Sequence, residues 1–139
     1  MSATTSIEGL RLYQSSRKLE DAIYEMVKRL PQTEFYQLGN DLRRSSAGVS
    51  HYITECHRRY SYSVKLEALY LARTESETLQ RLLQAHQAQG YGDTKALQNA
   101  CTGIIKQTWG LIRFLKQRQA ERQQDVQRAS ADQLVAARS

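Results

Sequence analysis

Hydrophobic residues recur every three or four positions along most of this sequence, the spacing that places them on one face of an α-helix. The pattern is clearest between residues 42 and 61, where Leu42, Val49 and Cys56 repeat every seven residues. At about 100° per residue, these positions and those that fill the steps between them share one narrow face, which we expect to be buried. The predicted buried face consists of Leu42, Ser46, Val49, Ile53, Cys56 and Tyr60.

The same periodicity predicts four helices. The first spans residues 9–30 and ends before Pro31, because proline disfavours helical geometry in the residue that precedes it. The second spans residues 34–60, the third begins at one of the serines that follow, and the fourth begins after a glycine-containing break at residues 90–93. Because the connections are short, we predict an all-α, antiparallel, up-down-up-down four-helix bundle.

The pattern also divides the chain into three segments. Residues 1–8 are predicted to be a disordered lead, and residues 9–118 to form the four-helix bundle. Residues 119–139 are polar and rich in Gln, Ala and Arg, which predicts a helical extension or a flexible tail. A chain of 139 residues is long enough to bury about two-thirds of its surface around a single core.

Charge adds a candidate partner. The chain has 20 Lys and Arg residues against 14 Asp and Glu residues, a formal net charge of +6. Such a surface attracts anions, and nucleic acid is the first candidate. The alternative is a basic protein that is merely soluble, because net charge alone specifies neither fold nor partner.

The basic residues are not spread evenly. Arg44, His51 and Arg58 lie seven residues apart on the side of the second helix opposite the buried face, and Arg59 lies beside them. A second basic strip lies near the end of the fourth helix, and its candidate binding residues are Lys106, Arg113 and Lys116. Arg118 and Arg122 continue the strip, part of which simply complements the C-terminus of a helix. Guanidinium groups interleaved with aromatic rings suit phosphates and unstacked bases, so we predict that both sets bind nucleic acid. The alternative is a solvated face whose arginines pair with carboxylates such as Asp41, each pair contributing about 0–1 kcal/mol.

The fourth helix carries more apolar surface than one core face needs. Ile105, Trp109 and Ile112 lie about 100° to 160° away from the direction of Leu111, which belongs to the core stripe. Because a contiguous apolar patch that contains Trp is typical of interfaces, we predict that these three residues form a contact between subunits. The alternative is a wide core face.

We find no constellation that predicts catalysis, a metal site or a cofactor. The histidines, His51, His57 and His86, lack the Glu-x-x-His spacing of a di-iron bundle, and no phosphate-binding loop or nucleophile elbow is present. Cys56 and Cys101 lie on predicted core stripes without CxxC spacing, which indicates buried thiols in a reducing compartment. No apolar run approaches about 18 residues, so we expect a cytoplasmic protein that does not enter a membrane. Because no catalytic constellation is found, we also expect that it is not an enzyme.

A motif in the second helix resembles the four-helix-bundle family of 23S rRNA intervening-sequence proteins. The family hallmark is two Arg, two small residues and then a Ser-Ile-x-x-Asn-Ile-Ala-Glu-Gly-x-Gly-Arg-x-Ser run. This sequence departs from the hallmark at Tyr52, which replaces Asn, and at Cys56 and Arg58, which replace the two glycines. The resemblance covers about residues 9–118. The positions that match without a gap are Arg43, Arg44, Ser45, Ser46, Val49, Ile53, Glu55, Arg59 and Ser61.

This family is similar to the accessory variability protein of diversity-generating retroelements, a basic bundle that forms homopentamers and binds a reverse transcriptase and nucleic acid. The resemblance therefore implies a homopentameric ring without enzymatic activity, with ribosomal RNA or a reverse transcriptase as candidate partners. Two hypotheses follow. The first is an oligomeric accessory protein that binds RNA or DNA through its basic surface. The second is a scaffold that binds only protein, with the basic surface facing an acidic partner.

Overall fold

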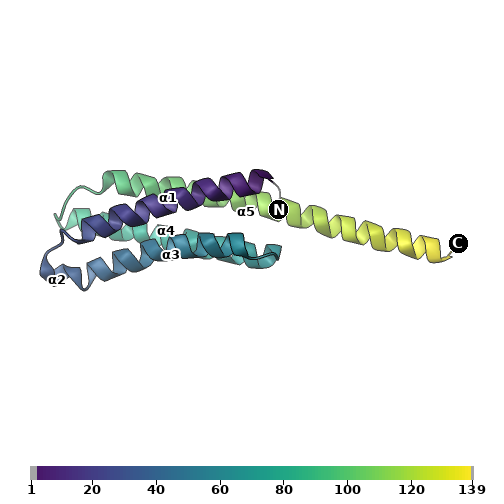
Figure 1. Cartoon of the computed structure of the whole chain (residues 1–139), viewed down its shortest axis with the longest axis horizontal. Helices are drawn as coiled ribbons and strands as arrows, with labels where there is room; N and C mark the ends of the chain where they lie inside the picture. Colours follow the sequence, from purple (N-terminus) through teal and green to yellow (C-terminus); the bar gives the residue numbers. More distant parts are fainter. Residues whose placement is uncertain (1–2, 139) are drawn as a thin grey trace.

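The computed structural model describes residues 3–138, with side chains described from residue 9 onward. The described chain is all-helical and contains no β-strand. Figure 1 shows the long helices side by side, with the last of them, α5, projecting well beyond the others. The elements are α1 (Ala3–Val27), the single turn α2 (Gln32–Phe35), α3 (Leu38–Arg58), α4 (Tyr62–Ala88) and α5 (Lys95–Arg138).

The apolar stripes of the four long helices meet in one core. The predicted buried face of α3 is confirmed from Leu42 to Cys56, each of its members being at most 4% exposed. Tyr60 is the exception, with 97% of its surface exposed. The helix ends at Arg58 and the next residue is extended, so Tyr60 leaves the helical face to which it was assigned. The largest fully buried side chains are Leu12, Ile23, Leu42, Ile53, Leu69, Leu79, Leu83, Ile112 and Leu115.

Several predicted boundaries differ from those observed. Residues 3–8, predicted to be a disordered lead, belong to α1, while residues 1–2 lie outside the described range. Residues 28–30, predicted to be helical, form a turn after α1 ends at Val27. Residues 36–37 interrupt the predicted second helix and separate α2 from α3.

The connection between α3 and α4 is closed by a buried charge. Lys65 is 4% exposed, and its Nζ atom donates a hydrogen bond to the carbonyl oxygen of Cys56, 2.7 Å away. This carbonyl is in the last turn of α3, where helix geometry provides no partner for it. The lysine therefore satisfies the end of one helix from the first turn of the next.

The packing of the helices against one another determines where the predicted sites on α3 and α5 lie. Each of α3 and α5 packs against both α1 and α4, and α3 and α5 make no comparable contact with each other. These two helices therefore occupy opposite corners of the bundle. The last part of α5 leaves the bundle altogether, and residues 120–138 are all exposed (Figure 1).

Candidate nucleic-acid interface

The predicted basic residues of α3 are exposed, but most of their charge is already paired. Arg44 Nη2 lies 2.6 Å from Asp41 Oδ1, one turn away on the same helix. Arg59 Nη2 lies 2.8 Å from Glu55 Oε2, and Arg58 Nη1 lies 3.9 Å from Glu55 Oε1. Two carboxylates thus form ion pairs with three arginines, which is the arrangement expected of a solvated face with its own surface ion pairs.

His51 lies on the same exposed face of α3, as predicted. Its ring meets that of Tyr52 edge to face, with the centroids 5.1 Å apart. This contact leaves the imidazole at the surface.

The basic residues of α5 are in a different state. Lys106, Arg113 and Lys116 are exposed, and no carboxylate in the described part of the chain lies within 4.0 Å of their charged nitrogens. Lys116 Nζ lies 5.4 Å from the ring centroid of Tyr70, a cation–π contact that leaves its charge unneutralised. These cations can therefore meet an external anion without first losing an internal partner.

An aromatic and guanidinium cluster lies between α4 and α5, next to these cations. The rings of Tyr70 and Trp109 pack edge to face, with centroids 6.4 Å apart and an interplanar angle of 85°. The guanidinium carbon of Arg73 lies 4.6 Å from the centroid of Trp109 and 5.5 Å from that of Tyr70. Among the described residues, Arg73 Nε is buried and has no hydrogen-bond partner, and Glu77 Oε1 lies 3.7 Å from it.

Helical spacing explains why these groups come together. Lys106, Trp109, Arg113 and Lys116 follow one another in steps of three, four and three residues and so share one face of α5. The seam is held further along by Gln80 Nε2, which donates hydrogen bonds to the Thr102 hydroxyl and to a backbone carbonyl of α5. We call the resulting surface the α4–α5 face and define it by Tyr70, Arg73, Lys106, Trp109, Arg113 and Lys116.

The structure therefore divides the predicted nucleic-acid site in two. Arg44, His51 and Arg58 lie on α3 and Arg59 directly follows its last turn, whereas the remaining three residues lie on α5, at the opposite corner of the bundle. They do not form one continuous site within a single chain.

The predicted subunit contact is wrong at Ile112. This residue is 0% exposed and belongs to the core of its own chain, so it is unable to meet another subunit. Ile105 and Trp109 are half-buried, and the part of Trp109 that faces α4 is covered by Tyr70 and Arg73. A subunit contact through these two residues stays a prediction.

Sequence reasoning missed Tyr70 and Arg73. A signal was available, because Arg73 and Trp109 each lie 18 residues from Tyr91, in the connection between the two helices. A hairpin folded at that point places the two residues opposite each other. The periodicity along each helix alone carries no information on the register between two helices.

Neither cysteine is an activated nucleophile. Burial raises the pKa of Cys56 to about 11, and the nearby Lys65 ammonium opposes this shift only in part. Burial raises the pKa of Cys101 to about 12. Both thiols are therefore protonated near neutral pH, as expected for core residues.

His86 is a buried titratable group at the end of α4. It is 3% exposed, its ring packs edge to face on Tyr91 with centroids 5.7 Å apart, and Nδ1 has no hydrogen-bond partner within the described chain. Burial lowers the pKa of His86 below its usual value, while a hydrogen bond with the backbone of Gly92 acts in the opposite direction.

Acidification is expected to destabilise the fold through His86. Because the folded pKa lies below the unfolded value of 6.5, the unfolded chain binds the proton first, and stability is lost as the pH falls from about 6.5 through the folded pKa. The slope is at most about 1.4 kcal/mol per pH unit. Urea denaturation between about pH 7.5 and 5 measures it. His86→Gln should flatten the dependence and His51→Gln, at an exposed site, should not; equal slopes in all three proteins would contradict this assignment.

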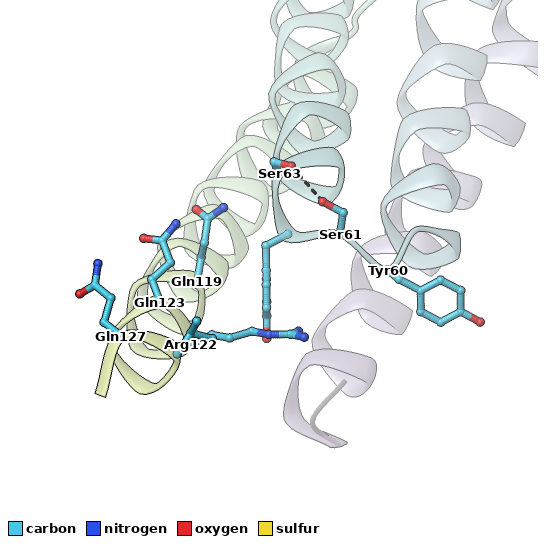
Figure 2. Close-up of a pocket in the computed structure, with 9 residues that line it drawn as sticks. Tyr60, Ser61, Ser63, Gln119, Arg122, Gln123 and Gln127 are labelled. Atoms are coloured by element: carbon cyan, nitrogen blue, oxygen red, sulfur yellow. Dashed lines mark hydrogen bonds between the residues drawn. The ribbon is translucent and has the colours of Figure 1, made fainter. Parts of the chain in front are cut away.

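A groove of about 760 Å³ lies between the α3–α4 connection and the projecting part of α5 (Figure 2). Its walls are residues 60–63 on one side and Gln119, Arg122, Gln123, Val126 and Gln127 on the other. Figure 2 shows Tyr60 pointing away from α5, and Arg122 is the charged side chain among the lining residues. Because its polar groups do not converge, the groove is a weaker candidate for anion binding than the α4–α5 face.

The described residues contain no cluster of three or more His, Cys, Asp or Glu side chains arranged to hold a metal ion. Among the described helices, none combines the length and the apolar character needed to cross a lipid bilayer.

Fold and site together define a class of protein, an all-helical bundle that presents unpaired basic side chains around a half-buried tryptophan. The family model for the 23S rRNA-intervening sequence protein matches residues 8–110, and the chain belongs to this family. The resemblance seen in the α3 motif is therefore confirmed.

A solved structure supports the fold. The chain is similar to a protein of unknown function from the S23 ribosomal protein family of Bacteroides thetaiotaomicron, with 17% sequence identity and a TM-score of 0.71. The match covers 98% of that protein but 76% of this chain. No curated protein matches the sequence. The family match ends at residue 110, so Arg113, Lys116 and the projecting part of α5 lie beyond it.

Proposed function

We propose that this chain is a non-enzymatic, homo-oligomeric accessory protein that binds nucleic acid through the α4–α5 face. The observation that carries the proposal is the set of exposed cations on α5 that have no carboxylate partner in the described chain and that surround the Arg73–Trp109 stack. Of the four basic side chains on this surface, Arg73 alone has a carboxylate within 4.0 Å in the described part of the chain, that of Glu77.

The chemistry of this surface fits a polyanion that carries flat bases. Lysine and arginine neutralise phosphates and release condensed counterions, which supplies most sequence-independent affinity. Tyr70 and Trp109 add rings on which bases stack, and Arg73 adds a planar guanidinium with the same capacity. The name of the family makes ribosomal RNA the first partner to test.

The assembly is part of the proposal. Contacts along the α4–α5 seam pair Gln80 with Thr102, Arg73 with Trp109, and Tyr70 with Lys116, which supports an antiparallel, up-down-up-down order of the four long helices. We also propose that the chain forms a homopentamer, the state that its family resemblance implies. A ring would present five copies of the α4–α5 face to one nucleic acid and so raise its avidity.

Binding measured against salt concentration tests the function. If three or four phosphates are contacted, the affinity for single-stranded RNA should fall roughly 20- to 50-fold between 50 and 200 mM salt. Fluorescence anisotropy with an rRNA fragment and a DNA of the same sequence measures this fall and separates the two nucleic acids. Protein purified without nuclease should also carry nucleic acid, seen as a raised ratio of absorbance at 260 nm to that at 280 nm.

The scaffold hypothesis predicts the opposite result. A protein that binds only protein would purify free of nucleic acid and would not shift either labelled strand at low salt. That outcome would indicate that the basic surface binds an acidic protein instead of nucleic acid. Electrostatic complementarity supplies the same attraction for such a partner.

A further inference from the structure

We propose that the α4–α5 face takes single-stranded nucleic acid, with one unpaired base stacking on the indole of Trp109 while Arg73 turns toward a phosphate of the same strand. The inference rests on the proposed function and names the substrate class and the contact at that site. RNA and DNA share the chemistry required, a flat base attached to a phosphate chain.

The first support is the state of the tryptophan. Trp109 is the single Trp of the chain, it is half-buried, and it packs edge to face on Tyr70. The guanidinium of Arg73 occupies a position 4.6 Å from its ring centroid. A planar cation therefore already lies over the ring face on which a base would stack.

The second support is the unsatisfied donor on Arg73. A buried N–H without an acceptor costs free energy, and Arg73 Nε is in this state with Glu77 Oε1 at 3.7 Å. The side chain of Arg73 is 24% exposed, so part of it already reaches the surface. Turning the guanidinium outward to a phosphate gives this N–H an acceptor and uncovers the indole ring of Trp109. In the exchange of cation for base, both the guanidinium and the indole therefore gain a new contact.

The third support is the placing of the other cations. Lys106 and Arg113 are spaced one heptad apart on the same face of α5 as Trp109, and Lys116 lies one turn beyond. Phosphates of a strand whose base lies on Trp109 therefore find lysine and arginine on either side of it along the helix. A duplex keeps its bases stacked inside and has no free base to offer, so it can use these cations but not the indole.

Intrinsic tryptophan fluorescence tests the contact directly, because the chain has one Trp. The ligands are short homopolymers of thymidine and of uridine, a duplex of equal length, and an abasic strand with the same phosphates and no bases. Both homopolymers should quench Trp109 emission on binding, whereas the duplex and the abasic strand should bind more weakly and leave the emission nearly unchanged. The two homopolymers also measure any preference between DNA and RNA.

Variants separate stacking from charge. Trp109→Leu should lower the affinity for the homopolymers roughly 5- to 150-fold, because one stacked base is lost. The salt dependence should not change, because no phosphate contact is lost. Arg73→Gln should lower the salt slope by about 0.7 and keep the quenching. Tyr36→Leu, at an aromatic side chain 67% exposed elsewhere, is the matched control and should change nothing. Circular dichroism verifies that each variant is folded, and Trp109→Phe, which keeps an aromatic ring, should recover part of the affinity.

Four results would overturn the inference, and the last of them would reject the proposed function as well. Equal binding of the abasic strand and the homopolymers would show that only phosphates are read, and the proposed function would stand without the stack. Base-dependent binding without quenching would place the base elsewhere. Sedimentation of Trp109→Leu as a smaller species than the unchanged protein would instead assign the ring to a contact between subunits. Failure of every ligand to bind at low salt would reject the proposed function itself.

Discussion

Replacing Ile112 with aspartate is expected to leave the chain unfolded. The side chain is 0% exposed, so the substitution removes a large apolar group from the core and buries a carboxylate in its place. Changes of this kind cost more than about 4–5 kcal/mol, against a total stability of about 5–15 kcal/mol for a domain. Far-ultraviolet circular dichroism and sedimentation of the purified variant measure the outcome.

The matched control lies one heptad earlier on the same helix. Ile105→Asp introduces the same group at a half-buried position, and the chain should remain helical. If Ile105 is part of a contact between subunits, this variant should also sediment as a smaller species. A folded, soluble Ile112→Asp protein would refute the assignment of that residue to the core.

Removing the charges of Lys106, Arg113 and Lys116 together is expected to weaken binding to single-stranded nucleic acid about 100-fold at 0.1 M salt and to lower the salt slope by about 2. The three residues should each be changed to glutamine, which keeps the length of a polar side chain and removes the charge. Because all three are exposed, the thermal midpoint should not change. Anisotropy titrations across a series of salt concentrations supply both values.

The same number of charges can be removed from α3 for comparison. Arg44, Arg58 and Arg59 pair with Asp41 and Glu55 in the structure, so their change to glutamine should weaken binding less than about threefold. Equal losses of affinity in the two triple variants would show that the basic residues of α3 also belong to the binding surface. A larger loss from the α3 variant would reject the α4–α5 face as the principal site.

Much of the fold followed from local spacing. The stripe that contains Leu42 and Val49 was predicted as buried and is buried, because a helix with one apolar face has no other stable place for it. Helix ends were predicted less well. Tyr60 was placed on that stripe by counting, yet it is 97% exposed, because α3 ends before it. The end of a helix depends on what its last carbonyls meet, here Lys65 from the following helix, and periodicity carries no such information.

The sequence predicted the basic residues of the site on α5 but not how they are arranged with residues of α4. Lys106, Arg113 and Lys116 are exposed cations, as their spacing indicated, but Arg73 and Tyr70 come from another helix and were not found. Ile112 shows the same limit in reverse. It has the same heptad position as Ile105, yet one is fully buried and the other half-buried, because burial depends on which side chains of the neighbouring helices cover each position.

By itself the sequence determined the helices, their inward faces, the excess of positive charge and the family, because each of these is written in residue identity and in spacing along one helix. Only the tertiary structure decided which charges are free and which are paired, that the basic residues of α3 and α5 lie at opposite corners, and that Arg73 stacks on Trp109. The physical reason is that ion pairing and stacking act over a few ångströms between side chains from different turns and helices. Those distances are fixed by packing.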